Sequence, residues 1–111
     1  MTLEQAADGP ERTPDGRYVI INGRRWRATD PEISDDAAAV LRRELMSARR
    51  AVGAALKADD PQAERVARDR VQRAKVALGE RGTPWWEQAS EERRARWSDL
   101  VELLAAPPEV R

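Results

Sequence analysis

Residues 37–78, AAAVLRRELMSARRAVGAALKADDPQAERVARDRVQRAKVAL, contain two helical patterns separated by a single break. In the first pattern, apolar residues recur at steps of four, three, four and four, which is the period of one face of an α-helix. These positions are Leu41, Leu45, Ala48, Val52 and Leu56. The second pattern has a thinner stripe of smaller residues, which are Ala63, Ala67, Val71, Ala74 and Leu78. Because so short a connection folds two helices back on each other, the segment predicts an antiparallel helical hairpin about 30 Å long.

The ends of both helices have recognisable signals. The first helix is expected over 34–58, with either Asp30 or Ser34 as its N-cap, since these side chains accept hydrogen bonds from free backbone N–H groups. The second helix is expected over 61–80. Asp60 is its expected N-cap, and the proline that follows occupies the first helical position, where the missing N–H is harmless.

On the N-terminal side, residues 17–29 predict a β-hairpin. The run YVII is followed by Asn22-Gly23, a pair that tolerates the positive φ angles of a type I′ turn, and then by RRWR. Because side chains alternate along a strand, each face of the hairpin receives two residues from each run. One face is expected to hold Val19, Ile21, Arg24 and Trp26. The other is expected to hold Tyr18, Ile20, Arg25 and Arg27.

On the C-terminal side, a third helix is expected over 90–105, with Ser90 as its N-cap. Its expected apolar face consists of Trp97, Leu100, Val101 and Leu104. Residues 1–15 contain few large apolar side chains and predict a mobile tail, and residues 107–111, which begin with two prolines, predict a frayed end. The fold class expected is mostly α: a long antiparallel helical hairpin, a short N-terminal β-hairpin and a third C-terminal helix, in one small domain over 16–106.

Composition excludes many kinds of catalytic site. The 111 residues contain neither cysteine nor histidine, which removes disulfides, thiolate nucleophiles, imidazole catalysis and the metal sites that need those ligands. The carboxylates stand mainly at expected helix starts, where a cap explains them, and no glycine-rich phosphate loop occurs in the sequence. A Mg²⁺ site made of carboxylates alone is the alternative that the composition leaves open. We therefore expect a protein that is not an enzyme, and we assign no catalytic, cofactor-binding or metal-binding residues.

The hydropathy of the chain and its first residues indicate where the protein is located. A run of 18 apolar residues, which a membrane-spanning helix would need, does not occur. The first residues, MTLEQAADGPER, lack the basic flank and apolar stretch of a secretory signal. The expectation is a cytoplasmic protein without membrane contact.

The arginines of the hairpin are the first candidates for partner binding. Arg25 and Arg27 flank Trp26, and such a group offers guanidinium forks for carboxylate or phosphate together with an aromatic face. The alternative is structural, with Arg25 and Arg27 paired to acidic residues of the helices. Since Lys+Arg 20 equals Asp+Glu 20, the chain lacks the basic excess of most nucleic-acid-binding proteins, and nucleic acid is an unfavoured partner.

Trp85 and Trp86 are the second candidates. Neighbouring side chains of an extended segment point to opposite sides, so one ring is expected under the hairpin beside Trp26 or Trp97 and the other at the surface. The sequence leaves open which of the two is exposed. The exposed ring is the expected partner anchor, because tryptophan is enriched at interface hot spots.

Three stretches carry a resemblance to a known family. DGRYVIINGRRWRATDPEI, ELMSARRAVGAAL and VQRAKVALGERGTPWWE, within residues 15–87, resemble a family of short, uncharacterised bacterial proteins with RWRATDP-like and ALGERG-PWW-like segments. Some members carry the label "biopolymer transporter Tol". The resemblance implies that segments 24–31 and 79–86 belong to one shared design, and it implies no activity or binding residues.

The function expected is a small non-enzymatic module that binds a protein partner or self-associates as a homo-oligomer. The alternative is a nucleic-acid-binding accessory protein that uses the arginine-rich hairpin.

Overall fold

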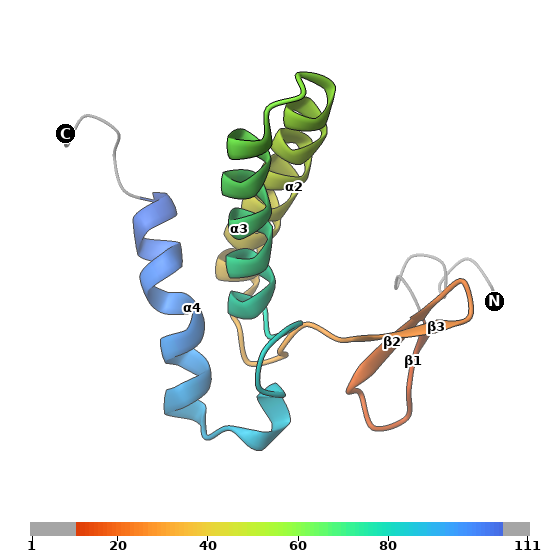
Figure 1. The fold of residues 1–111 in the computed structure, drawn as a ribbon. Coiled ribbons are helices and arrows are strands. Elements are labelled where there is room, and N and C mark those ends of the chain that lie inside the picture. The colour runs from red at the N-terminus through yellow and green to blue at the C-terminus, as the bar shows by residue number, and fades with distance from the viewer. Residues whose placement is uncertain (1–10, 106–111) are drawn as a thin grey trace.

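Three α-helices and a small antiparallel sheet make up residues 11–105, the part of the chain that this computed structural model describes. The strands are β1 (Glu11–Arg12), β2 (Tyr18–Ile21) and β3 (Arg24–Arg27). The helices are α2 (Asp35–Lys57), α3 (Pro61–Ala77) and α4 (Ser90–Ala105), and the 3-10 turn η1 (Trp85–Glu87) precedes α4. Figure 1 shows the α-helices side by side and the sheet beside the end where α2 begins and α3 ends. The predicted fold class is confirmed, while the tails expected at 1–10 and 107–111 lie outside the described residues.

The hairpin has the predicted turn and register. Asn22 (φ 52°) and Gly23 (φ 78°) both adopt positive φ angles, as the turn requires. The four residues of β2, taken from Tyr18 to Ile21, pair in order with the residues of β3 taken from Arg27 back to Arg24. Because the register decides which side chains share a face, the two predicted faces of the hairpin are confirmed.

A third strand extends this hairpin, in a region that the sequence assigned to the tail 1–15. β1 pairs with β2, with Glu11 opposite Ile20. A tight turn over residues 13–16 reverses the chain direction between β1 and β2. In this turn the Gly16 N–H donates to the Thr13 carbonyl (2.9 Å), and the Asp15 carboxylate accepts from the Thr13 hydroxyl (2.7 Å). The prediction was therefore wrong for residues 11–15, because the Pro-Asp-Gly turn orders a segment with few apolar residues.

α2 and α3 form the predicted helical hairpin. The N-cap of α2 is Ser34 and not Asp30, since the Ser34 hydroxyl accepts from the Ala37 N–H at 3.2 Å. Asp60 caps α3 by accepting from the Ala63 N–H at 3.1 Å, with proline in the first turn as predicted. α3 ends at Ala77 rather than at residue 80, because Gly79 leaves the helix with a φ of 84°.

Small side chains fill the seam between α2 and α3, which lets the two backbones approach closely. The buried residues of the hairpin are Ala37, Ala38, Leu41, Leu45, Ala48, Ala55, Ala67, Ala74, Ala77 and Leu78. The predicted stripes were wrong at their ends: Leu56 and Ala63 are exposed, whereas Ala55 is buried. A stripe that steps by four drifts around a helix of 3.6 residues per turn, so the preceding position faces the partner by the end of α2.

α4 covers the hairpin with its predicted face. Trp97, Leu100, Val101 and Leu104 pack against the buried cluster, although no residue of α4 is itself fully buried. Ser90 is not the cap: it is the first helical residue, and the Glu92 carboxylate accepts from the Ala89 N–H at 2.9 Å. None of the helices within residues 11–105 is long and apolar enough to cross a bilayer.

Candidate functional site

The sheet, the end of α3 and η1 meet at a junction around Trp85. Trp85 is only 8% exposed, and its indole N–H donates to the Ala28 carbonyl at 2.9 Å. Directly beside it, the Asp30 N–H donates to the Leu78 carbonyl at 2.9 Å. A Cβ atom on Gly79 would lie 2.9 Å from the Asp30 Cβ and 3.1 Å from the Trp85 Cδ1. The junction therefore requires glycine at this position, both for its positive φ and for space.

A buried ion pair ties α4 to this junction. Asp30 is 2% exposed, and its carboxylate accepts from the Arg93 Nε at 3.1 Å and from the Arg93 Nη2 at 2.5 Å. The Arg93 guanidinium lies 5.0 Å from the Trp85 ring centroid and also pairs with Glu32 at 3.1 Å. The hydrogen bond to Asp30 raises the pKa of Arg93 above its ordinary value, although desolvation opposes it. Sequence reasoning missed this pair, because Arg93 is 63 residues from Asp30 and stands in an ordinary charged helix start.

Trp86 lies on the outer side of the junction and is half-buried. Its ring meets Trp85 edge-on, with centroids 5.1 Å apart and planes at 85°, and it meets Tyr18 at 5.6 Å and 62°. The guanidinium carbons of Arg17 and Arg27 lie 4.8 Å and 5.8 Å from its centroid. Trp86 therefore connects η1 to one face of the sheet through ring–ring and cation–π contacts.

The structure brings the four predicted site residues together. Arg25 lies over the Tyr18 ring at 4.7 Å, and the Arg27 Nη1 donates to the Gly82 carbonyl at 2.7 Å. Trp85 is buried behind this surface and contacts it through the Trp86 ring. We call the surface the arginine–aromatic face, and its residues are Arg17, Tyr18, Arg25, Arg27 and Trp86. Sequence analysis did not single out Arg17 and Tyr18 as binding residues, although the alternation along β2 had placed Tyr18 beside Arg25 and Arg27.

The tryptophan prediction was right about burial and wrong about neighbours. Trp85 is the buried ring and Trp86 the more accessible one, but the aromatic partner of Trp85 is Trp86. Trp26 is on the opposite face of the sheet, and Trp97 packs with the core of the helices. The segment is a 3-10 turn rather than an extended strand, and successive side chains of such a turn are about 120° apart, so neighbouring rings can touch.

Acidic partners for the hairpin arginines are not found in residues 11–105. The ion pairs there join Glu44 to Arg70, Glu64 to Arg68, Asp69 to Arg73, Glu80 to Lys75, and Asp30 and Glu32 to Arg93. Arg25 and Arg27 instead use an aromatic ring and a backbone carbonyl. Within the described chain, the structural alternative of pairing with helix carboxylates is therefore wrong for both residues.

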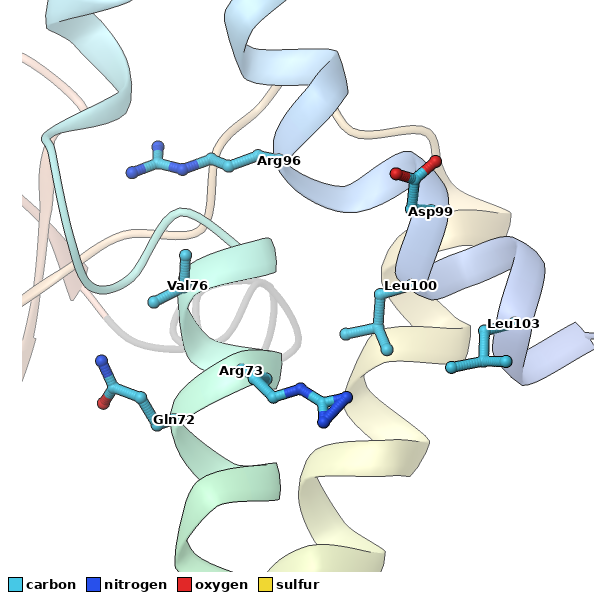
Figure 2. Close-up of a pocket in the computed structure, with 7 residues that line it drawn as sticks. All are labelled: Gln72, Arg73, Val76, Arg96, Asp99, Leu100 and Leu103. Carbon is cyan, nitrogen blue, oxygen red and sulfur yellow. The ribbon is translucent and has the colours of Figure 1, made fainter.

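A separate groove lies between α3 and α4, with a volume of about 390 Å³. Figure 2 shows Arg73 on α3 extending toward Leu100 and Leu103 on α4, while Arg96 extends from α4 toward the other side of the groove. The Arg96 guanidinium donates to the carbonyl of Thr83, which holds the segment before η1. The groove has no set of groups suited to acid–base chemistry, and residues 11–105 contain no cluster of three potential metal ligands.

Comparison with known proteins adds no relative: no protein-family model, no curated protein and no solved structure matches the chain. The resemblance described from the sequence therefore stays a prediction.

Proposed function

We propose that this protein is a non-enzymatic cytoplasmic module that binds an acidic segment of a protein partner through the arginine–aromatic face. The observation that carries the proposal is the position of Trp86, a half-buried ring with the guanidinium carbons of Arg17 and Arg27 at 4.8 Å and 5.8 Å from its centroid. A central aromatic ring with arginines around it is the composition of interface hot spots. An arginine stacked on a ring keeps its N–H donors in the plane of the guanidinium, where a carboxylate can accept two of them.

The contacts of the rings favour a protein partner over a nucleic acid. Guanidinium groups already lie over Tyr18 and Trp86, the two rings of this face. Single-stranded nucleic acids bind by stacking bases on such ring faces. The balanced net charge also gives weak long-range attraction to a polyanion. Nucleic acid remains the alternative ligand of the same face.

The test is affinity capture from a lysate of the native host, with and without nuclease, followed by mass spectrometry. Trp86→Ala and the double variant Arg25→Gln/Arg27→Gln should lose the captured protein. The matched controls are Trp26→Ala, on the other face of the sheet, and Arg42→Gln/Arg43→Gln on α2, which should keep it. Retention by Trp86→Ala would contradict the proposal. Capture that disappears with nuclease would support the nucleic-acid alternative.

Self-association is the second form of the proposal, and exposed apolar side chains on the helices favour it. Met46, Leu56, Val66 and Leu103 are all exposed, and Leu103 is 64% exposed at the edge of the groove in Figure 2. Packing these side chains against a second copy would remove apolar area from water. Equilibrium light scattering over a 100-fold concentration range tests this form, since self-association makes the average mass rise with concentration.

A further inference from the structure

We propose that the cleft between the sheet and the helical hairpin binds a small organic anion that carries an apolar ring or chain. The cleft has a volume of about 460 Å³, within the range of about 300–1,000 Å³ that small-molecule sites occupy. It lies on the face of the sheet opposite the arginine–aromatic face. The cleft and the partner site share only Arg27 among the residues named for them, and the other side chains that form the two sites differ.

The wall formed by the sheet is mainly apolar, although Arg24 belongs to the same face and its guanidinium lies 4.8 Å from the centroid of the Trp26 ring. Val19 and Ile21 share this face of β2, and Trp26 is paired with Val19 across the hairpin. Ile21 and Trp26 remain accessible, with Trp26 43% exposed. An indole ring next to two branched aliphatic side chains forms a flat surface, which suits an aromatic ring or a short hydrocarbon chain.

The opposite wall is cationic. Arg42 and Arg49 lie two turns apart on α2, about 10 Å along the helix axis, and Lys75 projects from α3. Arg12 and Arg27 add two more positive charges at the side of the sheet. Five cationic residues therefore line a cleft that contains one carboxylate.

That carboxylate, Glu80, is already engaged. It accepts from the Thr29 hydroxyl at 2.7 Å through one oxygen and lies 3.9 Å from the Lys75 Nζ through the other. The Lys75 side chain is only 14% exposed. Desolvation lowers the pKa of Lys75, Glu80 raises it, and the charges of Arg81 and Arg49 lower it further. The positive charge in the cleft is thus only partly balanced, and an anionic group placed there would relieve its repulsion.

The two walls together define the ligand class. A neutral apolar molecule would leave the cations unbalanced, while inorganic phosphate would leave Trp26 and Ile21 in water. A carboxylate, sulfonate or phosphate attached to a ring or short chain satisfies both walls. Complementary polar and apolar contacts of this kind give small-molecule sites their orientation and specificity.

The experiment titrates the full-length, ¹⁵N-labelled protein with 2-naphthoate and with its uncharged counterpart 2-naphthamide. The indole N–H signal of Trp26, assigned with Trp26→Phe, reports binding. We expect 2-naphthoate to shift this signal and to bind at least tenfold more tightly than 2-naphthamide. In Arg49→Gln/Lys75→Gln, the affinity for 2-naphthoate should fall at least tenfold, and the affinity for 2-naphthamide should not change.

The control variant is Arg50→Gln/Lys57→Gln, which removes the same two residue types from exposed positions on α2 outside the cleft. It should bind 2-naphthoate as the unmodified protein does. Equal loss in both double variants would mean nonspecific charge attraction and would overturn the proposal. Equal affinity for the two probes, or a shift confined to the other indoles, would also overturn it. Far-UV circular dichroism confirms that each variant is folded.

Discussion

Replacing Trp85 by alanine should lower the free energy of unfolding by about 3–5 kcal/mol, as large-to-small substitutions of buried aromatic residues do. The magnitude follows from the structure, in which Trp85 is 8% exposed. Burying an indole removes roughly 200 Å² from water, which at about 25 cal/mol per Å² contributes about 5 kcal/mol as an upper bound. Loss of its hydrogen bond to the Ala28 carbonyl adds about 1 kcal/mol. Since a small domain has a total stability of only about 5–15 kcal/mol, this substitution should be severe.

Trp86→Ala provides the comparison, because its ring is half-buried and holds the junction through ring contacts, whereas Trp85 also donates a hydrogen bond to the Ala28 carbonyl. We expect a loss of about 1–2 kcal/mol from its cation–π and ring–ring contacts. The assay is urea unfolding followed by far-UV circular dichroism, since tryptophan fluorescence changes with the substitution itself. Similar slopes with urea would confirm that the variants share one denatured state. Equal destabilisation by the two substitutions, or a loss below about 1 kcal/mol for Trp85→Ala, would refute the assignment of Trp85 as the anchor of the junction.

Three further predictions follow from other parts of the structure. Gly79→Ala should lower the free energy of unfolding in urea by about 2–4 kcal/mol, because the φ of Gly79 is 84° and an added Cβ would clash. Gly53→Ala, in open space on α2, should raise the free energy of unfolding by about 0.5–1 kcal/mol. Similar effects of the two substitutions would contradict the close approach at Gly79. After reductive ¹³C-methylation, the Lys75 signal should titrate below the ordinary pH range of a lysine side chain, since burial lowers the pKa of Lys75. Between this lowered pKa and the ordinary value of about 10.4, Lys75 is protonated to a greater extent in the unfolded chain than in the folded one. The free energy of unfolding should therefore rise with pH in this range, and this rise should be absent in Lys75→Met. Light scattering should give a mass that rises with concentration for the unmodified protein and stays at the monomer for Leu103→Ser; a monomer throughout would exclude self-association.

The elements that sequence reasoning predicted correctly depend on neighbours in the chain. The Asn22-Gly23 turn determines the register of the hairpin, and Asp60 caps α3 through a hydrogen bond that spans three residues. At the N-terminal segment two local signals conflict: a turn sequence favours order, and a low content of apolar residues favours a mobile tail. The Thr13–Gly16 turn outweighed the low apolar content of the N-terminal segment, and β1 was missed for that reason.

The parts that could not be predicted depend on contacts between distant residues. Asp30 looks like an ordinary helix cap, and only the fold shows that Arg93 neutralises it in a buried position. The candidate site was partly predictable, because strand alternation already placed Tyr18, Arg25 and Arg27 on one face. Trp86 was a candidate from the sequence, but its position against this face could not be predicted, because its orientation depends on the 3-10 turn and on its contact with Trp85.

The way in which charged side chains are paired explains why the sheet contributes to both proposed sites. On the helices, several acidic and basic side chains pair with each other, and Glu44 with Arg70 forms two hydrogen bonds of 2.8 Å and 3.0 Å across the hairpin. The arginines of β3 instead lie on aromatic rings or backbone carbonyls, which leaves the sheet positively charged. Because strand side chains alternate, a strand of four residues supplies both surfaces: Arg25 faces the partner site and Trp26 faces the cleft. A substitution at either position should therefore impair one binding function and leave the other intact.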